Sequence, residues 1–135
     1  MFFRKKSTTW LRCSLGAVLL AGVVGGCGGG GARPPKWSFI AATIVEPNCA
    51  TASCHSAVAQ RAGVVLTPRD TAYKTLITRK FVIPGDCPNP GECQDSEMVA
   101  LLRAQGSRRM PPDFALPEAD IELIEHWINE GATND

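Results

Sequence analysis

The segment Cys49-Ala50-Thr51-Ala52-Ser53-Cys54-His55 constrains this 135-residue chain more than any other stretch. Two cysteines followed at once by a histidine are the arrangement by which a chain binds haem covalently. The thiols add to the two vinyl groups of haem, and the adjoining imidazole reaches the iron from the same loop. The usual spacing is C-x-x-C-H, whereas this chain has C-x4-C-H. The inserted residues are all small, so the longer loop can still lie close against a flat macrocycle.

Two other interpretations of Cys49 and Cys54 stay open. In an exported chain the pair could form a short disulfide. The pair could also contribute to a zinc site, but a closed zinc site needs four protein ligands. The sequence has no second cluster of metal-binding residues. We therefore favour haem attachment through Cys49 and Cys54, with His55 as an iron ligand.

Residues 1–26 have the features of an export signal. Their first half is basic, with no acidic side chain, and residues 15–24 form a short apolar core. This core is too short to be a stable transmembrane helix. It ends in Val24-Gly25-Gly26-Cys27, which resembles the lipobox of bacterial lipoproteins. The resemblance implies cleavage before Cys27 and attachment of lipid to this cysteine; an ordinary signal peptide is the alternative.

The composition after residue 26 indicates a tether followed by one mildly acidic domain. Residues 27–35 are rich in glycine and end in two prolines, as is typical of a linker. Without residues 1–26 the chain keeps 10 basic and 13 acidic residues, a net charge of −3. Nucleic-acid-binding domains are strongly basic, so we expect no nucleic-acid partner. We expect residues 36–135 to face the periplasm or the cell exterior, anchored to the membrane by lipid.

The spacing of apolar residues over 36–135 predicts a small all-α domain of about four short helices. The first helix should cover 38–45 and end at Pro47. The second should begin with Thr67 as its cap and Pro68 in its first turn. The third should run from residue 95 or 96 to 104, and the fourth from 117 to 130. A core of this size is modest, and a buried haem would supply much of its apolar contact.

Two residues on the predicted helices bear on iron ligation. Met98 shares an apolar helix face, so we interpret it as a core side chain. His126 is the only histidine besides His55, and with Glu122 and Glu125 it falls on the polar face of the last helix. A histidine that faces solvent does not favour a bis-histidine iron site.

Two loops carry the remaining candidate residues. Cys87 and Cys93 lie in the proline- and glycine-rich loop 82–95 and should form a disulfide with each other. Met110 is followed by Pro111-Pro112, which stiffen the backbone, and a thioether suits haem iron. Met110 is therefore the candidate second iron ligand.

Arg108 and Arg109 directly precede Met110. A guanidinium can bind a carboxylate through two parallel hydrogen bonds, so both residues are candidates for binding the haem propionates. Solvated surface charges are the alternative interpretation of this pair.

Taken in order, these features resemble the class I c-type cytochromes, especially the small haem-binding domains found in bacterial lipoproteins. The shared order is a helix, a C…CH motif, a loop methionine and a closing amphipathic helix, over about residues 39–132. The resemblance implies one haem c with thioether bonds to Cys49 and Cys54, His55 as proximal ligand and Met110 as distal ligand. It also implies that the first and last helices cross. The side chains expected at that crossing are Phe39, Ile40, Ile44, Ile124, Trp127 and Ile128.

The resemblance implies a membrane-anchored one-electron carrier of the cell envelope that exchanges electrons with a redox protein. We expect no enzymatic activity, because the sequence shows no Ser/His/Asp set, paired carboxylate site or phosphate-binding loop. The alternative is a haem-free lipoprotein domain, stapled by disulfides, with a structural or partner-binding role.

Overall fold

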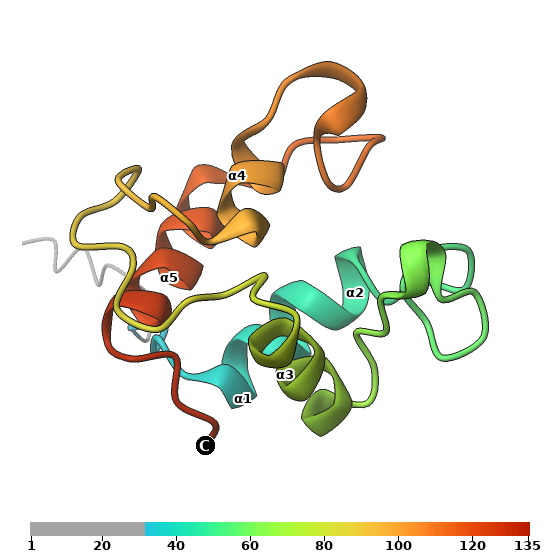
Figure 1. Cartoon of the computed structure of the whole chain (residues 1–135), viewed down its shortest axis with the longest axis horizontal. Coiled ribbons are helices and arrows are strands. Elements are labelled where there is room, and N and C mark those ends of the chain that lie inside the picture. Colours follow the sequence, from blue (N-terminus) through green and yellow to red (C-terminus); the bar gives the residue numbers. More distant parts are fainter. Residues whose placement is uncertain (1–31) are drawn as a thin grey trace, which may run out of the picture. The chain divides into compact units, whose positions relative to one another are not determined.

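This computed structural model describes residues 32–135, which form short helices joined by turns and irregular loops and contain no strand (Figure 1). The expected small all-α class is confirmed. The predicted signal segment 1–26, the lipidation site Cys27 and the start of the tether lie outside the described residues. The helical elements are α1 (Trp37–Ile40), η1 (Ala41–Val45), α2 (Glu46–Asn48), η2 (Arg61–Gly63), α3 (Arg69–Thr78), α4 (Glu97–Arg103), η3 (Gly106–Arg108) and α5 (Glu118–Asn129).

The first helix is continuous from α1 through η1 to α2, so the prediction that it ends before Pro47 was wrong. Its middle segment, η1, is a π-helix, in which the N–H of Glu46 donates to the carbonyl of Ala41. Pro47 follows directly after this π segment, in which the hydrogen bonds span five residues instead of four. The helix can therefore continue to Asn48 and deliver Cys49 directly to the loop that follows.

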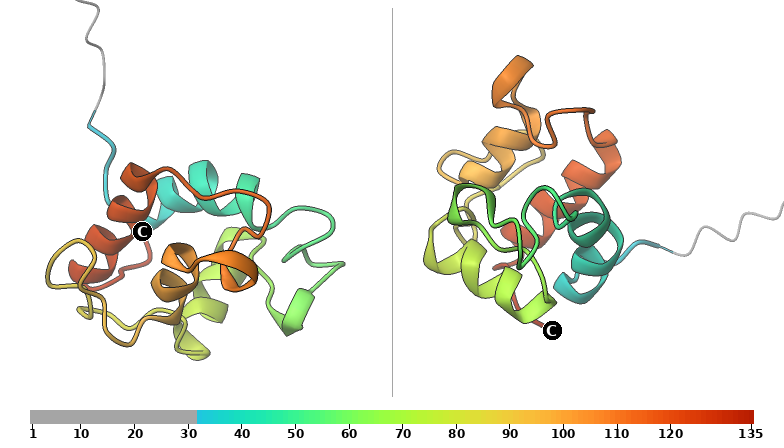
Figure 2. Two further views of the ribbon diagram at one scale, coloured as in Figure 1. Left: turned by 90° about the horizontal axis from the view of Figure 1, so that it is seen from above. Right: turned by 90° about the vertical axis from the view of Figure 1, so that its right-hand side faces the viewer.

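The first helix and α5 lie against each other (Figures 1 and 2). Two stacked tryptophans pack between them. The rings of Trp37 and Trp127 lie 5.0 Å apart with an interplanar angle of 27°. Tyr73 of α3 contacts both rings and donates its hydroxyl hydrogen to the carbonyl of Ala132, at 3.0 Å. Aromatic burial of this kind therefore joins α1, α3 and α5 into one core.

Phe39 does not have the core position that the sequence suggested. It is only half-buried, and the guanidinium of Arg33 lies 5.9 Å from the centre of its ring. Arg33 also forms an ion pair with Asp120 of α5. The end of the predicted tether thus contacts the folded domain, and Trp37 takes the buried place that was assigned to Phe39.

The side chain of Asp86, which lies in the preceding loop, caps the backbone at the start of α4. Its carboxylate accepts hydrogen bonds from the backbone N–H groups of Gln94, Asp95 and Ser96, at 2.7–3.3 Å. Partial burial raises the pKa of Asp86, but these bonds and one from the Ser96 hydroxyl outweigh it and hold the pKa below its ordinary value. Ser96 is the cap residue by position, yet its hydroxyl accepts from Ile83 N–H instead of from α4.

The starts and ends of the other helices differ slightly from the sequence predictions. Pro68, not Thr67, stands at the cap position of α3, and no side chain caps this helix. The third predicted helix ends at Arg103 because the backbone of Ala104 is extended, and Gly106 opens the short turn η3. Gly131 follows α5 with φ +97°, a conformation that favours glycine at a helix end.

Glu125 is buried, so its assignment to the polar face of the last helix was wrong. Only 1% of it is exposed, and both of its oxygens are bonded to Arg103 of α4, at 2.7 and 3.0 Å. The N–H of Gly91 also donates to this carboxylate, at 2.9 Å. Arg103 of α4 supplies the positive charge that allows Glu125 to be buried. The spacing of apolar residues in α5 alone does not reveal this partner. His126, in contrast, is exposed as expected.

The structure joins Cys87 and Cys93 in a disulfide. Cys87 is almost fully buried against the core, whereas the loop between the two cysteines is largely exposed. The disulfide therefore attaches the loop that contains Gly91 to the helical core.

Candidate functional site

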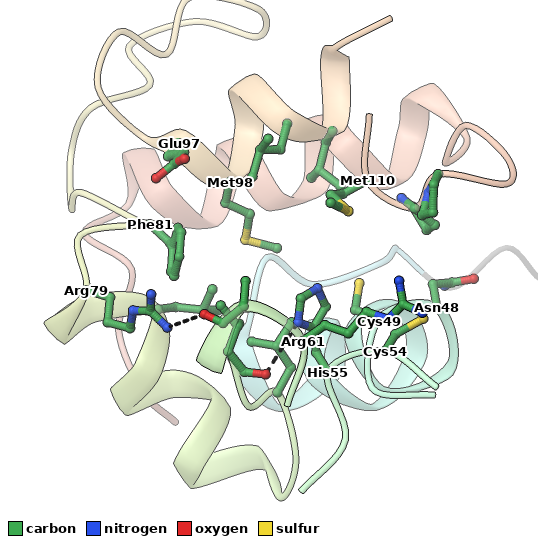
Figure 3. A pocket seen from close by; sticks show the side chains of 18 residues that line it. Asn48, Cys49, Cys54, His55, Arg61, Arg79, Phe81, Glu97, Met98 and Met110 are labelled. Atoms are coloured by element: carbon green, nitrogen blue, oxygen red, sulfur yellow. Dashed lines mark hydrogen bonds between the residues drawn. The ribbon is translucent and has the colours of Figure 1, made fainter. Parts of the chain in front are cut away.

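A cavity of about 620 Å³ separates the cysteine–histidine loop from α4 and the loop that follows it (Figure 3). One wall carries Cys49, Cys54 and His55, and the opposite wall carries Met98 and Met110. Most of the remaining lining is apolar; it includes Val64, Leu66, Leu76, Phe81, Leu101, Leu102, Pro111 and Pro112. The cavity therefore offers an apolar volume with soft sulfur and imidazole groups on two facing walls.

The loop from Cys49 to His55 is closed by its own backbone. The N–H of His55 donates to the carbonyl of Cys49 at 3.0 Å, and the N–H of Cys54 donates to Thr51 at 3.0 Å. The carbonyl of His55 in turn accepts from Leu66 at 2.8 Å. The four-residue insert thus forms a turn that places both cysteines and the histidine on the same side of the cavity.

The imidazole of His55 is oriented by a backbone carbonyl. Its Nδ1 lies 3.3 Å from the carbonyl oxygen of Val64, which can accept a hydrogen bond only if Nδ1 carries the proton. In that tautomer Nε2 keeps its lone pair and is the available ligand atom. In Figure 3 the ring faces the wall that carries Met98 and Met110.

Within residues 32–135 Cys49 and Cys54 are free thiols in different environments. Burial, and to a smaller extent the nearby Cys54, raise the pKa of Cys49 to about 11. Hydrogen bonds from Thr51 and Ser53 lower the pKa of Cys54 below its ordinary value. Both cysteines line the cavity, so both sulfurs are available to a molecule bound there.

Two methionines, not one, line the wall opposite His55. Met110 comes from the loop after η3, is 37% exposed, and donates its N–H to Leu101 at 3.0 Å. Met98 comes from the first turn of α4 and is 8% exposed. The core assignment of Met98 agrees with its burial, but its side chain also reaches the cavity, as Figure 3 shows.

The arginines at the cavity differ from those that the sequence suggested. Arg108 is exposed on η3, and Arg109 points its guanidinium at the carbonyls of Pro111 and Pro112; neither lines the cavity. Arg61 and Arg79 do line it. Neither residue has a local sequence signal for this role, because the fold of the intervening loops brings each to the wall.

Arg79 is held at the end of the cavity away from the cysteines (Figure 3). One guanidinium nitrogen donates to the carbonyl of Gly63 at 2.8 Å, and the group stacks over Phe81 with 5.1 Å to the ring centre. Arg61, at the cysteine end, donates to the carbonyl of Ser53 at 2.9 Å. The cavity therefore has one hydrogen-bonded cation at each end, Arg61 beside the thiols and Arg79 at the opposite end.

No family model, curated protein or solved structure matches this chain. In the described part of the chain, no three His, Cys, Asp or Glu side chains gather closely enough to hold a metal ion. None of the helices within residues 32–135 combines the length and apolar character needed to cross a bilayer.

Proposed function

We propose that this domain holds one covalently bound haem c and acts as a one-electron carrier. The observation that carries the proposal is a single cavity with Cys49, Cys54 and His55 on one wall and Met110 on the facing wall. Sequence proximity explains the first three residues, but Met110 is 55 positions beyond His55. Its arrival at the same cavity is an independent argument for a ligand between the two walls.

The residues at the cavity fit a haem. Its volume, about 620 Å³, lies within the range of roughly 300–1,000 Å³ usual for cofactor sites, and its lining is mainly apolar. Haem carries its two vinyl groups and its two propionates on opposite edges. The cavity has the thiols and Arg61 at one end, and Arg79 and Glu97 at the other (Figure 3). A haem held by the thiols would extend its propionates toward Arg79, the cation at that far end. We therefore assign the propionate-binding role to Arg79 in place of Arg108 and Arg109.

The protein groups have separable roles in this proposal. Cys49 and Cys54 would bind the haem covalently, while His55 and Met110 would be the ligands of its iron. The carbonyl of Val64 keeps Nε2 of His55 free to bind. Bound haem supplies reversible one-electron chemistry. Two side-chain ligands to the iron would favour electron transfer over catalysis.

The test is a haem assay under denaturing conditions. The chain is expressed together with a cytochrome-maturation system, and the purified protein is denatured, separated by electrophoresis and stained for haem. We expect a stained band that survives acid–acetone extraction. The Cys49→Ser/Cys54→Ser double variant should lose it, whereas His126→Ala, which changes an exposed histidine outside the cavity lining, should keep it. Fully processed protein without covalent haem would contradict the proposal and favour the haem-free domain.

We further propose that the domain is anchored in the cell envelope through lipid on Cys27 and there meets a redox protein. The support is the short apolar segment that ends in Val24-Gly25-Gly26-Cys27. Cys27→Ser should leave the protein unprocessed or release it from the membrane fraction. Mass spectrometry that finds a mature N-terminus without lipid would refute the anchor but leave the haem proposal intact.

A further inference from the structure

Two thioethers, from separate parts of the fold, reach the cavity wall that faces His55 (Figure 3). Resting on the proposed haem function, we propose that Met98 is a second distal ligand, which binds the iron whenever Met110 leaves it. A single ligand would need only one thioether on this wall. The burial of Met98 alone would also be satisfied by leucine, so burial does not account for a sulfur at the cavity.

The backbone that carries Met98 is firmly held. Its N–H donates to the carbonyl of Phe81 at 2.9 Å. The start of α4 is tied to Asp86 through Ser96, at 2.7 Å, and its last residue, Arg103, is tied to the buried Glu125. Met98 is therefore presented by a helix that is fixed at both ends.

The segment that carries Met110 is held by fewer contacts. Between α4 and α5 the only helical element is η3, and most residues there are exposed. Met110 is itself 37% exposed and is tied to α4 by one backbone hydrogen bond, to Leu101. Segments with few buried contacts open at lower free energy than the core. Met110 is therefore the thioether that would leave first, and Met98 the one that stays beside the cavity.

The exchange is chemically balanced. Met110 releases one sulfur–iron bond and Met98 forms another, with no electron or proton transferred. Both ligands are neutral thioethers, so the net charge of the site is unchanged. The consequence is that opening of the 104–116 segment would not expose a vacant iron position to small molecules. Met98 would keep the site six-coordinate and confine it to electron transfer.

The test compares haem-loaded wild type with Met110→Ala, Met98→Leu and the double variant. Ferric spectra report the sulfur-to-iron absorption, carbon monoxide titration of the ferrous form reports a vacant position, and methyl-labelled methionine NMR identifies the bound residue. We expect both single variants to keep the absorption, with the shifted methyl of Met98 in one and of Met110 in the other. The double variant should lose the absorption and bind carbon monoxide at least 100-fold more tightly than wild type.

Each alternative outcome has a distinct meaning. If Met110→Ala alone loses the absorption and binds carbon monoxide like the double variant, Met98 is not a ligand and the inference is wrong. If Met98→Leu alone loses it, Met98 is the sole ligand and exchange is also refuted. Wild type that never acquires haem refutes the proposed function and, with it, this inference. Circular dichroism verifies that each variant is folded, and Met98→Leu nearly conserves side-chain volume.

Discussion

Replacing Arg103 with methionine should lower the free energy of unfolding of the domain by about 3 kcal/mol. Glu125 is 1% exposed, and Arg103 donates to both of its oxygens, so the variant leaves a buried carboxylate with only the Gly91 N–H. Removing one partner of a buried ion pair costs about 3–5 kcal/mol. We take the lower end because 28% of the Arg103 side chain is exposed. Domains of this size are stable by about 5–15 kcal/mol, so the loss is a large fraction.

The assay is urea unfolding at pH 7 followed by circular dichroism, with the disulfide oxidised and the same haem content in all variants. In thermal unfolding, about 3 kcal/mol corresponds to a decrease in Tm of roughly 12–24 °C for a domain of this length.

Glu118→Gln is the matched control, because it removes the other ion pair of the same arginine. Glu118 is 61% exposed and bonds to Arg103 at 2.7 Å. Exposed pairs contribute at most about 1 kcal/mol, so this variant should lose no more than that. Arg103→Met/Glu125→Leu, which removes both charges, should recover part of the loss. If Arg103→Met costs no more than Glu118→Gln, the burial of Glu125 is not compensated by Arg103 and our reasoning fails.

Three further predictions concern the cavity and the loops. In haem-loaded protein, Arg79→Gln should lower the reduction potential, because it removes a cation from the propionate end of the cavity. The expected decrease in a redox titration is about 40 mV, equivalent to about 1 kcal/mol for one electron. Equal shifts for Arg79→Gln and Arg108→Gln would contradict the assignment of Arg79. The pKa of Asp86 is lower in the folded state than in the unfolded state. Its contribution to the free energy of unfolding is therefore fully present above the unfolded pKa of about 3.9, and it is lost as the pH falls through the folded-state pKa. Asp86→Asn should cost about 1–2 kcal/mol at pH 7 and progressively less as the pH falls below the unfolded pKa, measured by urea unfolding over a pH series. A cost that does not change over that series would exclude this linkage. Cys93→Ser should lower the free energy of unfolding by about 2 kcal/mol, from loss of the seven-residue loop closed with Cys87; unchanged denaturation would show that the loop is held without the bridge.

Local sequence patterns predicted the helices well and their limits less well. Apolar spacing located α3, α4 and α5, and glycine marked the end of α5, because these signals act over one or two helical turns. Pro47 was misleading, since a π segment ahead of it lets the first helix continue. Neither a π segment nor a distant cap such as Asp86 leaves a periodic signature in the sequence.

One wall of the cavity could be predicted from local sequence, whereas the other depends on tertiary structure. Cys49, Cys54 and His55 are neighbours in sequence, and the backbone of one loop brings them together, so the motif was sufficient to identify that wall. The facing wall depends on how α4 and the 104–116 segment lie across the loop.

Met98 was assigned to the core because helical spacing separates an apolar face from a polar one, but it does not separate a face that packs from a face that lines a cavity. Arg79 was missed for a related reason, since its position depends on the carbonyl of Gly63 and the ring of Phe81. Apolar periodicity thus measures how far a side chain is removed from water, and only the fold determines whether it meets another side chain or a bound molecule.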